Sequence, residues 1–303
     1  MIRPADRQSV SELKRLWKEC FADEDAYIDA FYKAVYEDQD VLLEEEGGML
    51  MGASFFLPGK IWAEQKGGSW QQTDGRWKDI RYVYALAVFP QYRGRGIAGR
   101  LLRSAYETYG APLIAEPAEE GLVSGFYEPL GFAKSFYLEK KQIVLPAADK
   151  MPSYDLRAAQ LQAELFVAGS SCTVAPIEAE DYCRIRDAAF FKRGYVRWPK
   201  RHIAFAIQEH RGSGGGAFVI KGNGQDDILL YFIDGQTAVV TETTLSDQAA
   251  QAVLVQLAGQ CEGAVMTRQV KARGMQKYPQ SLFLVGMSYG LEPAEGYLNL
   301  TLD

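Results

Sequence analysis

The feature that most constrains this chain is the segment at residues 84–102, YALAVFPQYRGRGIAGRLL. It begins with an apolar run typical of a β-strand, and Pro90 ends that strand because proline has no amide hydrogen to donate to a sheet. An Arg-Gly-Arg-Gly loop follows, after which Ile97, Leu101 and Ala105 recur at helical spacing. The segment therefore predicts a strand and a helix joined by a glycine-rich loop.

This loop has the properties of an anion-binding site. Glycine adopts positive φ angles and leaves room for a ligand to approach the backbone, while the first amides of a helix have no acceptor within the helix. Each anion–helix interaction contributes roughly 0.3–1 kcal/mol. We predict a phosphate cradle built from the backbone amides of one continuous stretch: Arg93, Gly94, Arg95, Gly96, Ile97, Ala98 and Gly99.

Other phosphate-binding motifs fit the same residues less completely. The string at residues 94–99 matches GxGxxG, and Glu116 lies near the place of the ribose-binding carboxylate in a dinucleotide-binding fold. In that fold the glycines follow the strand directly, whereas residues 90–93 intervene here. A P-loop requires Lys followed by Ser or Thr, and Arg100-Leu101 stands there instead. A glycine turn without a ligand also stays open.

The segment resembles the acetyl-CoA motif of the GNAT superfamily of N-acetyltransferases, Q/R-x-x-G-x-G/A after a strand of the form L-x-V-x-P. The matching residues are Leu86, Val88 and Pro90 in the strand and Gln91, Gly94 and Gly96 in the loop. Downstream, FYEPLGF at residues 126–132 is similar to the F-Y-x-x-x-G-F pattern of the family. Two motifs in this order are more specific than either alone, and the resemblance covers residues 1–145.

The resemblance implies acetyl-CoA as co-substrate, with its pyrophosphate on the cradle. Backbone groups of the strand would pair with the pantetheine arm at Leu86, Ala87 and Val88. Tyr127 matches the tyrosine that protonates the departing CoA thiolate. This role is chemically reasonable because a phenol titrates at about 10 and a thiol at about 8.5. A purely packed aromatic side chain beside Phe126 and Phe132 is the alternative for Tyr127.

The chain around this segment predicts an α+β fold, a mixed β-sheet flanked by helices. In the first half, helices are expected at 9–36, 96–109 and 122–130, and strands at 41–45, 49–56, 81–89, 112–115 and 136–145. The second half repeats this order loosely, with helices at 182–191 and 248–259 and strands at 217–221, 228–233, 237–245 and 263–267. We therefore expect two tandem GNAT-like copies.

A stretch rich in Pro, Ala and polar residues, 146–159, marks the domain boundary. We predict a catalytic, acetyl-CoA-binding domain at residues 1–148 and a degenerate GNAT-like domain without a cofactor site at 149–303. The second copy lacks the cradle because residues 244–248 enter its helix without a glycine, and Asp247 would repel a phosphate. The near-terminal stretch GYLNLTLD is expected to form a final strand toward the first domain.

Charge and composition exclude several classes of protein. The 33 Lys and Arg against 39 Asp and Glu give a net charge of −6, so nucleic-acid binding has no electrostatic basis. The start, MIRPADRQ, lacks a secretory apolar core, and no apolar run of about 18 residues occurs. Four scattered cysteines and two histidines form no metal motif. We expect a cytoplasmic protein with reduced thiols, without a metal, a membrane or a nucleic acid as partner.

The acceptor implied by the resemblance is a small-molecule or peptide amine, and no motif identifies the general base that it needs. The residues that stay open for this role are Glu116, Glu119, Glu120, Tyr82 and Tyr84. The acidic connection at 23–25 could attract a cationic amine. A non-catalytic acyl-CoA-binding or sensing protein is the alternative function. The oligomeric state is open, and a homodimer is compatible with the sequence.

Overall fold

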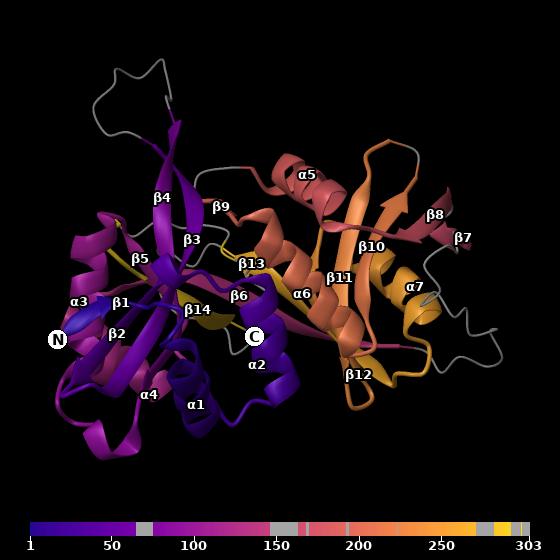
Figure 1. Ribbon diagram of the computed structural model, residues 1–303. Coiled ribbons are helices and arrows are strands. Elements are labelled where there is room, and N and C mark those ends of the chain that lie inside the picture. Colours follow the sequence, from indigo (N-terminus) through magenta and orange to yellow (C-terminus); the bar gives the residue numbers. More distant parts are fainter. Residues whose placement is uncertain are drawn as a thin grey trace, which may run out of the picture. The chain divides into compact units, whose positions relative to one another are not determined.

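The computed structural model describes residues 1–64, 75–145, 163–167, 170–191, 194–222, 224–270, 282–291 and 298. The chain divides into two compact units, each assembled from separate stretches of sequence (Figure 1). Unit 1 consists of Met1–Phe136, Val196–Pro199 and Leu284–Gly296, and unit 2 of Tyr137–Tyr195, Lys200–Phe283 and Tyr297–Asp303. The boundary predicted between residues 148 and 149 lies outside the described residues; the chain first passes from unit 1 to unit 2 between Phe136 and Tyr137.

The sheet of unit 1 has the strand order β1-β2-β3-β4-β5-β14. The strands are β1 (Ile2–Pro4), β2 (Val41–Glu46), β3 (Met49–Glu64), β4 (Gly75–Val88), β5 (Leu113–Ala115) and β14 (Leu282–Tyr289), with β9 (Val196–Arg197) paired to β3. Among these strands β4 and β5 are parallel, and the other neighbours are antiparallel. The helices are α1 (Val10–Phe21), α2 (Asp25–Ala34), α3 (Ile97–Tyr109) and the short α4 (Glu120–Leu122). The predicted fold class is confirmed.

The two faces of this sheet follow from the alternation of side chains along β3 and β4. Phe55 packs against Trp17 of α1 and Phe31 of α2, with ring centroids 5.2 and 5.3 Å apart. Its neighbour Phe56 belongs to the other core, which includes Leu101 of α3. The strands expected at 41–45 and 49–56 pair as a hairpin whose turn is Gly47-Gly48, where both glycines have positive φ angles, 59° and 79°.

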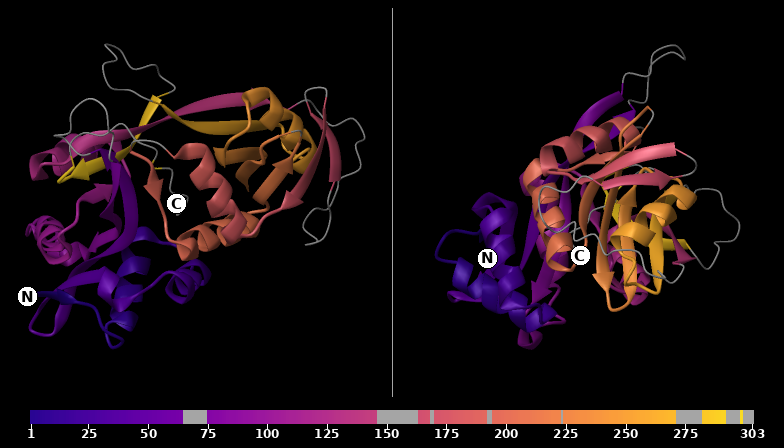
Figure 2. Two further views of the ribbon diagram at one scale, coloured as in Figure 1. Left: turned by 90° about the horizontal axis from the view of Figure 1, so that it is seen from above. Right: turned by 90° about the vertical axis from the view of Figure 1, so that its right-hand side faces the viewer.

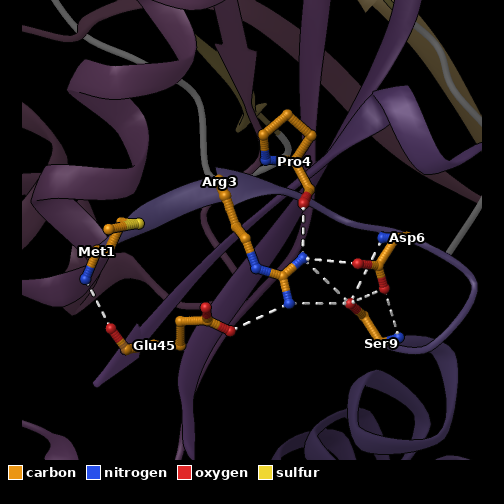
Figure 3. Close-up of polar contacts among 6 residues, drawn as sticks. All are labelled: Met1, Arg3, Pro4, Asp6, Ser9 and Glu45. Atoms are coloured by element: carbon orange, nitrogen blue, oxygen red, sulfur yellow. Dashed lines mark hydrogen bonds and ion pairs between the residues drawn. The ribbon is translucent and has the colours of Figure 1, made fainter. Parts of the chain in front are cut away.

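The chain start is fastened to β2 by a polar cluster (Figure 3). The Arg3 guanidinium donates to the Glu45 carboxylate at 3.1 Å and to Asp6 at 3.2 Å. Hydrogen bonds from Ser9 lower the pKa of the Asp6 carboxyl. The N-terminal amino group of Met1 donates to the Glu45 carbonyl at 2.6 Å. The cluster thus ties β1 and the residues that precede α1 to the strand that lines the core.

Unit 2 contains the strand order β6-β13-β12-β11-β10-β8-β7. The strands are β6 (Ala133–Val144), β7 (Ala163–Val167), β8 (Ser170–Pro176), β10 (Gly216–Lys221), β11 (Asp227–Asp234), β12 (Thr237–Thr243) and β13 (Gly263–Val270). The helices are α5 (Ala179–Phe190), α6 (Lys200–Gly212) and α7 (Asp247–Leu257), drawn in red to orange tones in Figure 2. The predicted meander is confirmed as β10-β11-β12, followed by α7 and by β13, which is parallel to β12.

The two units repeat one arrangement: an antiparallel meander, a helix, and a strand parallel to the last strand of the meander. A β-bulge recurs in each. In unit 1 the β3–β4 register shifts between Ala53 and Phe55, and in unit 2 the β11–β12 register shifts between Leu230 and Tyr231. Each shift lies within two or three residues of the last pair between the parallel strands. A shared order with a shared irregularity supports the duplication expected from the sequence.

Several elements have no counterpart in the sequence-based prediction, among them α6 and β14. The final strand expected in GYLNLTLD lies outside the described residues except for Leu298, and β14 instead pairs with β5. His202 and His210, expected at the surface or in a structural role, are both buried on α6. Burial lowers the pKa of His202 to about 3 and that of His210 to about 4. Both histidines are therefore neutral and structural at pH 7.

A fully buried ion pair gives a test of the unit 2 core. Arg186 on α5 and Glu242 on β12 are each 2% exposed, with Nε 3.0 Å from a carboxylate oxygen. Arg186→Met leaves the carboxylate buried without its cation, so we expect a loss of about 3–5 kcal/mol in the free energy of unfolding. Arg184→Met on the same helix, whose pair with Asp181 is 65% exposed on both sides, is the control and should cost below about 1 kcal/mol. Urea denaturation measures both, and equal small losses would contradict the expectation.

Candidate functional site

The glycine loop enters α3 through two left-handed residues. Gly94 has φ 77° and Gly96, the N-cap, has φ 72°, conformations that side chains with a Cβ disfavour. The first i→i−4 bond of the helix runs from the Arg100 amide to the Gly96 carbonyl at 3.1 Å. The amides of Ile97 to Gly99 therefore precede the helical ladder, and the first turn carries no acidic residue. A Cβ built on Gly94 meets nothing within 4 Å, so the loop has space on its outer side.

Arg100 braces this loop against β2. Its Nη2 and Nε donate to the Glu44 carboxylate at 2.6 and 3.1 Å, and its Nη1 donates to the Arg95 carbonyl at 2.7 Å. Glu44 is nearly buried, and its hydrogen bond raises the pKa of the Arg100 guanidinium. The guanidinium thus neutralises the Glu44 carboxylate and holds the Arg95 carbonyl in place at the start of α3. The sequence analysis missed Glu44 because the partners lie far apart in the chain.

The structure uses Arg93 differently from the other predicted cradle residues. Its amide donates to the Pro90 carbonyl at 3.3 Å, within the 3-10 turn Pro90–Tyr92. Its guanidinium Nε donates to the Val88 carbonyl at 3.2 Å. Arg93 therefore closes the turn between β4 and the cradle. The amides of Gly94, Arg95, Gly96, Ile97, Ala98 and Gly99 are the ones left for an anion.

The end of β4 extends beyond its parallel neighbour. The β4–β5 register ends with Val83 opposite Ala115, whereas β4 runs on to Val88. A bulge interrupts the β3–β4 pairing next to Ala85, which has a positive φ of 47°. Among the described strands, Ala87 and Val88 pair only with β3, and Leu86 lies in the bulge. Their other edge is available to an extended ligand, except that the Val88 carbonyl accepts from Arg93 and from the Cys20 thiol.

Tyr127 lies at the end of a π-helical turn, Val123–Tyr127, and is 6% exposed. Its ring meets those of Phe126 and Phe132 edge-on, with centroids 4.9 and 5.2 Å apart. Desolvation raises the pKa of the Tyr127 phenol to about 12, so it is protonated at neutral pH. The predicted aromatic packing is thus present, and it leaves the side chain in the form that can donate a proton.

An apolar pocket lies beside the cradle. It is shallow, with a volume of about 10 Å³, which is room for about one water molecule. Its lining consists of Gly99, Leu102, Arg103, Leu113, Leu130, Phe132 and Tyr289. Gly99 belongs to both the cradle and the pocket, and the Phe132 ring lies against that of Tyr127. The pocket therefore adds an apolar surface next to the cradle and does not enclose a ligand.

The open candidates for the base occupy different surroundings. Tyr84 shares a hydrogen bond of 2.6 Å with the hydroxyl of Tyr27, and the Tyr82 hydroxyl donates to Glu116 at 3.4 Å. Glu119 and Glu120 are exposed at the start of α4. The acidic connection is partly used within the fold: Asp23 accepts from the Trp17 indole at 2.7 Å, and Asp25 pairs with Lys18 at 3.0 Å.

Among the described residues, no group of three or more His, Cys, Asp and Glu side chains is placed to hold a metal ion. No described helix combines the length and the apolar character needed to cross a bilayer.

Comparisons with known proteins bear on this site. Residues 1–134 match the model of a family described as an acetyltransferase (GNAT) domain. None of the curated proteins matches the sequence. Similar solved structures include an Enterococcus faecalis protein named "Probable N-Acyltransferase" (12% identity, TM-score 0.66, 95% of this chain and 71% of that chain). Others are a GCN5-related N-acetyltransferase from Anabaena variabilis (14%, 0.62, 95% and 72%) and Eis1 from Mycobacterium abscessus (14%, 0.58, 95% and 73%). At these identities the likeness is one of fold.

The cradle can be tested at its first left-handed glycine. Gly94→Asp places a carboxylate where a phosphate would bind, so we expect at least about a tenfold rise in the dissociation constant of CoA, or about 1.4 kcal/mol. Gly110→Asp is a matched control, because Gly110 ends the same helix with φ 58° and its Cβ also meets nothing within 4 Å. Isothermal titration calorimetry measures both variants. Equal affinities would mean that phosphates bind elsewhere.

Proposed function

We propose that this chain transfers the acetyl group of acetyl-CoA to a primary amine, because residues 1–134 match the model of a GNAT acetyltransferase domain. The proposal rests on one observation: a free strand edge and the glycine loop lie at the same end of the parallel strands β4 and β5. The β4 edge at Leu86 to Val88 continues past β5, and the cradle at the start of α3 follows it after one short turn. A thioester on an extended arm with a pyrophosphate needs both.

The residues present suit acetyl-CoA as co-substrate. The cradle amides would hold the pyrophosphate, and the edge of β4 would pair with the amides of the pantetheine arm. An amide of β4 at Leu86 or Ala87 would also hydrogen-bond the thioester carbonyl as negative charge develops on its oxygen. The acetyl group would then pass directly to an amine in a ternary complex.

Tyr127 is the proposed general acid for the departing thiolate. A thiol titrates at about 8.5 in water, below the value of about 12 for Tyr127, so the transfer would be uphill for a solvated thiolate. The thiolate would form beside the same apolar side chains, however, and desolvation raises the pKa of a thiol as it does that of a phenol. This reduces the difference between the pKa of the thiol and that of Tyr127, and with it the free-energy cost of the proton transfer.

Unit 2 is proposed to be a degenerate copy without a cofactor site. Its helix α7 begins with a Ser246 side chain that caps the Ala249 amide at 3.3 Å, where unit 1 has an open glycine loop. Asp247 adds a negative charge in the first turn. The carboxylate of Glu242, near the bulge, is already occupied by Arg186 and by the Tyr182 hydroxyl at 2.6 Å.

The role of Tyr127 is tested by removing only its hydroxyl. We expect Tyr127→Phe to lower kcat by about 10²-fold, as loss of a positioned acid does, with little change in the KM for acetyl-CoA. Tyr109→Phe is the control, since Tyr109 is a partly buried tyrosine of unit 1 whose pKa is also raised to about 12 and whose hydroxyl donates to the Gln39 carbonyl. Thiol release with a panel of primary amines reports kcat. An unaltered kcat in Tyr127→Phe would remove the assigned role.

Ligand-induced stabilisation tests the co-substrate. A ligand at 100 times its dissociation constant adds about 2.7 kcal/mol to the free energy of unfolding, so acetyl-CoA and CoA should each raise the melting temperature by several degrees. NADH, the ligand of the dinucleotide-binding alternative, should leave it unchanged. The absence of a shift with either CoA species would contradict the proposal. Binding without thiol release for any primary amine would favour the acyl-CoA-binding or sensing alternative.

A further inference from the structure

Glu116 stands where the two parallel strands separate. It directly follows Ala115, the last residue of β5 that is paired with β4. Continuing the parallel register by one residue places Glu116 beside Tyr84, two residues before Leu86. With a rise of about 3.3 Å per residue, the two backbone positions are roughly 7 Å apart along the strand. Its half-buried side chain is thus within reach of the place proposed for the thioester.

Unit 2 shows what a different side chain does at the equivalent place. Met266 pairs with Val240 as Ala115 pairs with Val83, and in each unit this is the last pair of the parallel strands. Thr267 therefore corresponds to Glu116. Its hydroxyl lies 3.0 Å from the Val240 carbonyl and 2.9 Å from the Thr241 carbonyl, both of which belong to the bulged part of β12. Thr267 closes the gap between the strands with its own hydrogen bonds.

A carboxylate cannot make this closure. An ionised glutamate only accepts hydrogen bonds, and the carbonyl oxygens of a strand offer no donor. Glu116 in the unit that has the cradle, and threonine in the unit that lacks it, therefore place different chemistry at the separation of the parallel strands. A carboxylate there suits a ligand that brings hydrogen-bond donors and a positive charge.

Two aromatic residues hold the side chain of Glu116 in this position. The Tyr82 hydroxyl donates to Oε2 of Glu116 in a long hydrogen bond of 3.4 Å. Catalytic hydrogen bonds are often long before substrate binds and shorten in the complex. The indole of Trp198 meets the Tyr82 ring edge-on with centroids 5.6 Å apart, and both residues are 3% exposed. Trp198 follows β9, and Gly59 gives it room: a Cβ there would lie 3.0 Å from the indole.

We propose that Glu116 binds the ammonium group of the acceptor and removes its proton, and that Tyr82 and Trp198 are the residues that position it. This inference rests on the proposed acetyl transfer and deepens it by naming the base and the charge of the acceptor. The second half of the sequence then contributes to the reaction through Trp198, which belongs to unit 1.

The protons of the reaction balance. The ammonium group gives one proton to Glu116, which passes it to solvent, and the neutral amine attacks the thioester carbonyl carbon. The C–N bond forms and the C–S bond breaks, and the thiolate takes the proton of the Tyr127 hydroxyl. A second proton leaves the nitrogen and replaces the one that Tyr127 gave. The third stays on the amide product.

Two amines of nearly equal size distinguish the loss of a base from a structural effect of the substitution. At neutral pH ethylamine is almost wholly an ammonium ion, whereas 2,2,2-trifluoroethylamine is almost wholly neutral and needs no base before it attacks. We expect Glu116→Gln to lower kcat/KM for ethylamine by about 10²-fold and to change the value for 2,2,2-trifluoroethylamine far less. Glu107→Gln removes an exposed carboxylate from the last turn of α3, away from the cradle, and is the control that should leave both values unchanged. Equal losses for the two amines in Glu116→Gln would overturn the assignment.

The positioning residues are tested by the same ratio of kcat/KM values. Tyr82→Phe keeps the ring and removes the hydroxyl, and Trp198→Ala removes the indole; each should lower the ethylamine to trifluoroethylamine ratio by about tenfold, or about 1.4 kcal/mol. Trp198→Phe should restore part of the ratio. The KM for acetyl-CoA should stay unchanged in all three variants. A structural role alone would lower both amines together. An unchanged ratio in Tyr82→Phe, which keeps the packing, would overturn this part even if Trp198→Ala does not fold.

The wild-type chain distinguishes the two levels of inference. A chain that fails to bind acetyl-CoA overturns the proposed function itself. A chain that binds acetyl-CoA and acetylates 2,2,2-trifluoroethylamine as well as or better than ethylamine at neutral pH retains the proposed function, but overturns Glu116 as the group that receives the ammonium ion.

Discussion

The site depends on one constraint, the end of hydrogen bonding between β4 and β5 at Val83 and Ala115. Beyond this pair a bulge at Ala85 turns β4 away from regular pairing, and the strand keeps a neighbour on one side only. Backbone groups that a regular sheet would consume stay available, and the glycine loop that follows adds the amides of a helix start. The proposed binding of the thioester, the place of Glu116 and the position of the cradle all follow from where these two strands part.

The sequence allowed prediction of those features that depend on neighbouring residues. The hairpin at Gly47-Gly48 and the start of α3 are local, because turn chemistry and helical spacing act over a few residues. The brace between Arg100 and Glu44 and the indole of Trp198 on Tyr82 join distant parts of the chain, and no periodicity reports them. Even a local motif was incomplete at Arg93, whose amide is taken by a 3-10 turn that the loop pattern does not encode.

Comparison of the two units separates what the fold requires from what the site requires. Both have the meander, the bulge and the parallel strand, so these belong to the architecture. They differ at the point where the two parallel strands separate. In unit 2, Thr267 bonds the Val240 carbonyl and Arg186 pairs with Glu242, so these polar groups have partners within the unit. Unit 1 has the Glu116 carboxylate and the glycine loop at that point. Buried polar groups are costly when unpaired, so a copy that binds no ligand must supply its own partners.

The strand that flanks each parallel pair on the side of β5 or β13 comes from the other half of the sequence. In unit 1 β14 lies against β5 although it follows nearly all of unit 2 in the chain, and in unit 2 β13 is flanked by β6, which precedes that unit's other strands. During synthesis the first sheet must therefore wait with an unfilled edge until β14 has left the ribosome. No single break in the sequence therefore separates two complete sheets. A protein with one copy of this fold would need a strand of its own at the place that β14 takes beside β5.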